Sequence, residues 1–223
     1  MKGKGRGRGR GTWLVTLLPA VVAPAGAWGQ LVRPAAEAVV VTTRLESQVP
    51  AGTDRLSGVG FGGEGALWIG PVVLDLRYVQ GTLDSVSGGA GSRDMVEGGA
   101  LLGVRPVSWL TFAVGPQARA YVLGAGGATQ RWVFWEGRVR AAAPFVGSAV
   151  LGYVELWRAL GADVNVPEGF DHAQGGEAGM VVRLARAPVE ARLAYRIDRA
   201  VLGGGSRRET VDGVVVTLGV RRR

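Results

Sequence analysis

The sequence contains no cysteine and a single histidine, His172. The absence of cysteine excludes disulfide bridges and thiolate metal sites. One histidine leaves only carboxylates as further metal ligands, so we expect neither a metal ion nor a cofactor. His172 follows Asp171 in a predicted loop, 161–173, and adjacent side chains of an extended chain point to opposite sides. We therefore predict no catalytic residues and no enzymatic activity.

The sequence also lacks a long apolar run. A helix that spans a bilayer needs about 20 apolar residues, whereas the run from Trp13 to Ala23 is shorter and contains Pro19. Basic residues precede this run and Ala25-Gly26-Ala27 follows it, a combination that is typical of a cleaved export signal. We predict a signal peptide over residues 1–27 and one mature domain over residues 28–223.

Lysine is absent beyond Lys4, so arginine carries the positive charge of the predicted mature domain. Five of the 26 basic residues lie in the predicted signal, which leaves 21 cations against 18 acids and a net charge of +3. The arginines are dispersed among acids and apolar residues, so we expect no nucleic-acid partner. Gly58 to Gly63 matches GxGxxG by letter, but a strand pattern continues after it where a dinucleotide site needs a helix. These glycines favour strand curvature instead.

An acidic residue followed by a small one, and then by alternating apolar and polar residues, recurs along the chain. The repeats begin at Glu64-Gly65, Glu97-Gly98, Glu136-Gly137, Glu177-Ala178 and Asp212-Gly213, with spacings of 33, 39, 41 and 35 residues. Such a period predicts one supersecondary unit per repeat. We interpret each unit as a β-hairpin.

Alternation marks half-buried strands, most clearly in 72–80, where Leu74 and Leu76 share one face and Asp75 and Arg77 the other. The pattern predicts ten strands, with eight as an alternative: 36–46, 56–68, 72–82, 94–104, 108–122, 130–142, 146–160, 174–186, 189–202 and 208–221. The first is the least regular, because Val39, Val40 and Val41 do not alternate. The fold class is therefore all-β, a closed antiparallel up-and-down transmembrane β-barrel.

Short and long links between these strands alternate along the chain. Short turns are predicted at 70–71, 105–107, 143–145 and 187–188, and longer links at 47–55, 83–93, 123–129, 161–173 and 203–207. This asymmetry is typical of transmembrane barrels with short periplasmic turns and longer extracellular loops. Aromatic residues near both strand ends are expected to form girdles: Trp68 and Trp109 by the short turns, and Phe61, Tyr121, Trp132, Trp135 and Trp157 at the other ends.

On these patterns the chain resembles small bacterial outer-membrane β-barrel proteins of the eight-to-ten-strand kind. The resemblance implies export to the outer membrane of a Gram-negative-type cell, with the lipid bilayer and the barrel-assembly machinery as partners. Polar faces then point inward, and we predict a lumen network of paired charges, since buried charges need partners. Its members are Glu64, Asp75, Arg77, Glu97, Arg119, Glu136, Arg138, Arg140, Glu177, Arg183, Glu190, Arg192 and Arg196.

A small lumen packed with such pairs indicates a non-enzymatic barrel with a structural or surface-binding role. An unknown extracellular ligand would contact loops 83–93 and 161–173, because loops on rigid scaffolds commonly carry binding sites. Three alternatives stay open at this stage. They are a narrow passive channel for small solutes or ions, a hydrolase at the barrel rim, and a soluble periplasmic barrel that binds an apolar ligand inside.

Overall fold

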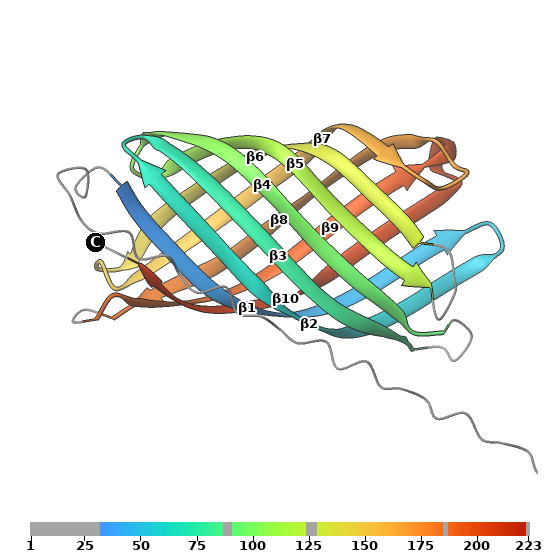
Figure 1. The fold of residues 1–223 in the computed structure, drawn as a ribbon, viewed down its shortest axis with the longest axis horizontal. Helices are drawn as coiled ribbons and strands as arrows, with labels where there is room; N and C mark the ends of the chain where they lie inside the picture. The colour runs from blue at the N-terminus through green and yellow to red at the C-terminus, as the bar shows by residue number, and fades with distance from the viewer. Residues whose placement is uncertain (1–31, 87–90, 124–128, 185–186, 222–223) are drawn as a thin grey trace, which may run out of the picture.

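The protein is a closed barrel of ten antiparallel strands in sequential order, seen in a computed structural model that describes residues 32–86, 91–123, 129–184 and 187–221 (Figure 1). The strands are β1 Val32–Val49, β2 Gly52–Ile69, β3 Val72–Ser85, β4 Arg93–Val107, β5 Leu110–Leu123, β6 Thr129–Val146, β7 Val150–Val164, β8 Phe170–Arg183, β9 Val189–Leu202 and β10 Arg207–Arg221. The ten-strand prediction is confirmed and the eight-strand alternative is wrong. The predicted signal peptide, 1–27, lies outside the described residues.

The barrel closes where β1 pairs with β10, with Ala35 opposite Arg221 and Gln48 opposite Arg208. The irregular first strand takes part in full: Val39 and Val41 point into the lumen, while Val40 points out. Because the period of a strand is two, three consecutive valines supply two inward and one outward side chain. Within the part of the chain that the structure describes, no helix is long and apolar enough to span a bilayer.

Several strands extend beyond their predicted ends. The predicted link 47–55 is mostly strand, since β1 and β2 continue to a tight turn at Pro50 and Ala51. Most of 161–173 is also strand, so the placement of His172 in a loop was wrong: it lies in β8 with an exposed side chain. At the other end, Pro106 and Pro144 lie within β4 and β6. Both occur at register shifts, where a missing N–H is tolerated.

The glycines of the GxGxxG match lie in the middle of β2, which continues as strand. A Cβ atom on Gly58 or Gly62 would lie 1.9 Å from the carbonyl oxygen of Thr82 or Tyr78 on β3. The backbones of β2 and β3 therefore approach so closely that these positions exclude a side chain. The glycines allow β2 and β3 to pair closely. They form no dinucleotide site, because a strand and not a helix follows them.

Apolar side chains point outward on all ten strands. On β3, Leu76 is 51% exposed and lies on the same face as Leu74, whereas Asp75 and Arg77 point inward. Closer to the long-link ends the outward residues become polar, as at Gln80 and Thr82. Water-soluble proteins rarely expose a continuous apolar surface of this kind. The soluble alternative with an apolar interior is therefore wrong, because its faces are the reverse of those observed.

The prediction of an aromatic girdle is confirmed only in part. Phe61 and Trp135 point outward and are more than half exposed. Tyr121, Trp132 and Trp157 were placed in the girdle wrongly, since all three are buried in the lumen. Trp68 also lines the interior, and Trp109 lies in the turn between β4 and β5. In β6, Trp132 has the same parity as Glu136 and Trp135 the opposite one, which is why the two tryptophans face different sides.

Candidate functional site: the lumen

An apolar layer fills the lumen near the long-link ends of the strands. Its members come from nine strands and are all buried: Leu45, Leu56, Leu83, Met95, Tyr121, Trp132, Phe134, Trp157, Ala173 and Leu202. The rings of Phe134 and Trp157 stack with centroids 5.6 Å apart and planes inclined by 17°. We call this set the apolar layer. It was missed because the sequence was expected to fill the lumen with charged and small residues.

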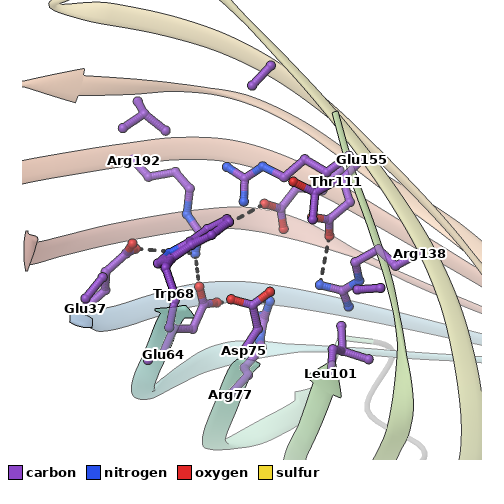
Figure 2. A pocket seen from close by; sticks show the side chains of 18 of the residues that line it. Glu37, Glu64, Trp68, Asp75, Arg77, Leu101, Thr111, Arg138, Glu155 and Arg192 are labelled. Atoms are coloured by element: carbon purple, nitrogen blue, oxygen red, sulfur yellow. Dashed lines mark hydrogen bonds and ion pairs between the residues drawn. The ribbon is translucent and has the colours of Figure 1, made fainter. Parts of the chain in front are cut away.

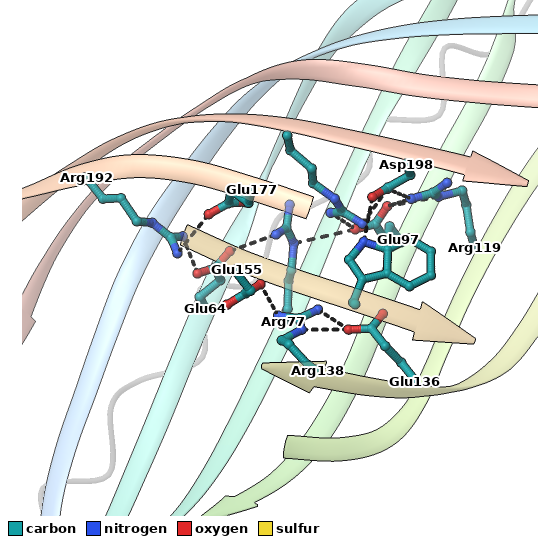
Figure 3. A network of polar contacts seen from close by, with 12 residues as sticks. Glu64, Arg77, Glu97, Arg119, Glu136, Arg138, Glu155, Glu177, Arg192 and Asp198 are labelled. Carbon is teal, nitrogen blue, oxygen red and sulfur yellow. Dashed lines mark hydrogen bonds and ion pairs between the residues drawn. The ribbon is translucent and has the colours of Figure 1, made fainter. Parts of the chain in front are cut away.

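Charged side chains lie deeper in the barrel, next to the apolar layer, and converge from opposite walls (Figure 3). Glu97 on β4 accepts hydrogen bonds from Arg119 on β5 at 2.7 Å and Arg196 on β9 at 2.5 Å. Asp198 binds the same two guanidinium groups, at 2.7 Å from Arg119 and 2.8 Å from Arg196. The indole Nε1 of Trp157 also donates to Asp198, at 2.8 Å, which ties the apolar layer to the charges.

Two further groups continue the network toward the short turns. Arg138 on β6 lies 2.5 Å from Glu136 and 2.9 Å from Glu155. Arg192 on β9 pairs with Glu64 and, at 3.7 Å, with Glu177. Arg77 joins the groups, because it lies 3.2 Å from Glu64 and 3.6 Å from Glu97. Each charge of these groups thus has an opposite charge close to it, as buried charges require.

All thirteen residues of the predicted network belong to strands and point into the barrel. Eleven of them form ion pairs; the last of these pairs, Arg183 with Glu190, spans 3.3 Å. Arg140 instead lies over the ring of Tyr153, 4.0 Å from its centroid. Asp75 makes no ion pair within the described residues.

Three acids of the network were missing from the predicted set. Glu37, Glu155 and Asp198 all point inward and pair with arginine. Their alternation with apolar neighbours, as in Val154-Glu155-Leu156, was the signal that could have revealed them. The fifth repeated acid, Asp212, behaves differently from the other four. It faces outward, where the hydroxyl of Tyr195 donates to it at 2.9 Å.

A cavity of about 390 Å³ occupies the lumen between the charge network and the short turns (Figure 2). Its walls carry acids and arginines from many strands, among them Glu64, Asp75 and Arg138, with Trp68 at one side. At the short-turn end it reaches Trp109, which is 55% exposed, and Arg183, whose side chain is 37% exposed. Within the described residues the cavity therefore extends to the short turns, and the network and the apolar layer lie at its other end.

The closed strand ladder, the apolar exterior and the charged interior together define a transmembrane β-barrel. Every backbone group of such a ladder is paired around the ring, which is the condition for crossing a bilayer with strands. Of the known barrels in this class, several solved structures are similar in fold.

The CymD monoaromatic hydrocarbon channel matches 87% of this chain and 70% of its own, with 9% identity and a TM-score of 0.38. Neisserial surface protein A matches 82% of this chain and 97% of its own, with 9% identity and a TM-score of 0.37. The translocator domain of the autotransporter NalP from Neisseria meningitidis matches 85% of this chain and 88% of its own, with 12% identity and a TM-score of 0.38. No protein-family model and no curated protein matches the sequence. The class follows from the chain's own ladder and surface.

Proposed function

We propose that this chain is a non-enzymatic barrel of the outer membrane, with a structural or surface-binding role, whose lumen does not conduct. The observation that carries the proposal is the apolar layer. Leu56, Leu83 and Tyr121 within it are each 1% exposed, so among the described residues apolar side chains pack together in the lumen at that level. An ion that crossed this layer would have to lose its hydration shell among apolar side chains. The free energy of that transfer is strongly unfavourable.

The charge network adds a second barrier. A barrel of about eight strands is just filled by its side chains, and open aqueous channels need about 16–18 strands. Arg119 and Arg196 join walls that are far apart in sequence, and moving either would remove one guanidinium partner from both Glu97 and Asp198. The proposed topology places the short turns in the periplasm and the long-link ends outside the cell.

The surface-binding role rests on the long-link end of the exterior. There the strands continue past the outward-facing apolar residues such as Leu74 and Leu76, which we call the apolar band, and present exposed charges, including Arg44, Arg131, Arg158 and Arg199. Links 83–93 and 161–173 rise from this end, although most of 161–173 is strand. Any extracellular ligand would meet this polar rim first, and its identity is not part of the proposal.

A narrow channel is the second candidate, because the cavity of about 390 Å³ already extends from the short turns into the middle of the barrel. Only the apolar layer and the ion pairs then separate it from the long-link end. Rearrangement of a few side chains, such as Phe134 and Trp157, would be needed to join the two sides.

Planar-bilayer recording of the purified, folded chain tests the proposal. We expect no unitary conductance steps, and none after Trp135→Ala, which alters an outward-facing tryptophan as the matched control. Trp157→Ala removes a ring from the apolar layer and is expected to give flickering openings. Regular, voltage-dependent steps from the unmodified chain, altered by Glu97→Gln or Glu136→Gln, would establish the channel and overturn the closed barrel.

A further inference from the structure

The cavity at the short-turn end is lined by some charged side chains that form no ion pair with the network. Its lining carries six arginines and six acids. Four of these arginines pair with five of the acids: Arg77 with Glu64, Arg138 with Glu155, Arg183 with Glu190, and Arg192 with Glu37, Glu64 and Glu177. Arg105, Arg140 and Asp75 remain. Within the described residues none of the three lies within ion-pair distance of an opposite charge.

Both remaining arginines are held by aromatic rings. The guanidinium carbon of Arg105 lies 4.7 Å from the centroid of Trp68, and that of Arg140 lies 4.0 Å from the centroid of Tyr153. Such contacts use the face of the guanidinium plane, while its N–H donors point outward from the edge. The rings therefore fix the two groups in place and leave donor edges for bidentate binding of an acid group.

The two arginines come from the strands on either side of β5. Arg105 reaches from β4 to Trp68 on β2, and Arg140 reaches from β6 to Tyr153 on β7. Asp75 lies on β3, between the strands that carry Trp68 and Arg105. The charges without a direct ion pair are thus two cations and one anion. They line a cavity whose volume is in the range of small-molecule pockets, about 300–1,000 Å³.

We propose that this cavity binds a small amphoteric solute that carries two acid groups and one ammonium group, such as an acidic amino acid or the end of an acidic peptide. Arg105 and Arg140 each bind one acid group, and Asp75 binds the ammonium. Ser108 and Thr111, which also line the cavity, provide hydroxyl partners. The inference rests on the closed lumen proposed above, because the solute enters and leaves only at the short-turn end.

Isothermal titration of the folded barrel in detergent micelles tests the site, with L-glutamate and glutarate as probes. Glutarate carries the same two acid groups but no ammonium. We expect saturable binding of one glutamate per chain and weaker binding of glutarate. Arg140→Gln should weaken both probes about tenfold or more, since a hydrogen-bonded charge pair is lost. Arg105→Gln should act in the same direction.

Asp75→Asn separates recognition of the ammonium from general charge effects. It should weaken glutamate and strengthen glutarate, so that the preference between the two probes disappears. Arg199→Gln, on the exterior near the long-link end, is the matched control and should change neither affinity. The heat-dependent gel shift of each variant shows that it has folded, and Arg105→Gln replaces Arg140→Gln if the latter does not fold.

Absence of binding to the unmodified chain overturns the proposal, as does equal weakening by Arg199→Gln and Arg140→Gln. A preference for glutarate that Asp75→Asn leaves unchanged overturns the amphoteric class. These outcomes are independent of conductance. A closed barrel that binds neither probe contradicts only this site, whereas a conducting barrel that binds glutamate contradicts only the closed lumen.

Discussion

At the residue scale, the lumen contains two buried tyrosines whose hydroxyl groups differ in hydrogen bonding. The hydroxyl of Tyr153 donates to Glu177 Oε1 at 2.5 Å. The hydroxyl of Tyr121 has no hydrogen-bond partner among the described residues, although the side chain is buried in the apolar layer. A buried donor that lacks a partner costs stability, whereas one bonded to a carboxylate adds to it.

The pair gives a direct test by substitution with phenylalanine. Tyr153→Phe should lower the free energy of unfolding by about 1.5–3 kcal/mol, because a hydrogen bond to a charged acceptor is lost. Tyr121→Phe removes only an unpartnered hydroxyl and should leave stability unchanged or raise it by about 1 kcal/mol. Urea titration of both variants in lipid vesicles measures the difference. Equal losses would show that the hydroxyl of Tyr121 has a partner after all.

The ion pairs of the lumen also belong to this scale. Replacing a buried pair by apolar residues is often neutral, so the network of Glu97 and Asp198 is weak evidence for stability. Removing one partner is different, because it leaves an uncompensated charge. The network therefore holds opposite strands of the barrel in a defined alignment. It joins residues as distant in sequence as Glu97 on β4 and Arg196 on β9.

At the scale of single elements, β2 shows why a strand can require glycine. A Cβ on Gly62 would lie 1.9 Å from the carbonyl oxygen of Tyr78, so β3 leaves no room for it. At the neighbouring Gly63 the nearest atom is the carbonyl oxygen of Glu37, at 3.5 Å, an ordinary contact. The two positions are adjacent in sequence but differ in how closely a neighbouring strand approaches, and in the face of the barrel on which a side chain would lie.

Gly62→Ala should therefore destabilise the barrel by ~1–3 kcal/mol or more, because overpacking forces a backbone shift. Gly63→Ala should change stability by less than about 0.5 kcal/mol, as surface substitutions usually do. The fraction of folded barrel on unboiled gels after refolding, followed across urea concentrations, compares the two. A larger effect at Gly63 would mean that the close approach of β2 and β3 is misplaced.

At the scale of the whole molecule, the apolar band decides where the bilayer lies. Leu76 belongs to the band, and Gln80 lies four residues further along β3 on the same outward face, beyond the band. Both side chains are exposed in the isolated chain, so burial within the protein does not distinguish them. Only a surrounding bilayer makes the two positions different.

Leu76→Arg should cost ~2–4 kcal/mol if it lies near the bilayer midplane, and Gln80→Arg about 0–1 kcal/mol near the interface. Folding titrations in vesicles measure both, and the heat-dependent shift in gel mobility reports barrel formation. Similar, small losses at the two positions would count against lipid contact at Leu76. The comparison thus tests the membrane assignment without relying on any similar protein.

Local pattern in the sequence determined much of this architecture. Alternation assigned the opposite faces of Leu74 and Asp75, because the side-chain period of a strand is two and needs no tertiary information. The short turns likewise determined that the strands they join are antiparallel, because parallel strands need a crossover of a dozen or more residues. Strand ends were less certain, since the outward polar residues near Pro50 resemble a loop until a partner strand pairs with them.

The tertiary structure alone decided which inward side chains meet. Arg119 and Asp198 are 79 residues apart, and their contact at 2.7 Å depends on the register of every strand between them. The same closure sorts the inward residues by height, with Trp132 and Trp157 in the apolar layer and Arg105 and Arg140 at the cavity. Sequence fixes the face on which each residue lies, but the level it reaches in the lumen depends on strand tilt and stagger, which exist only in the closed barrel.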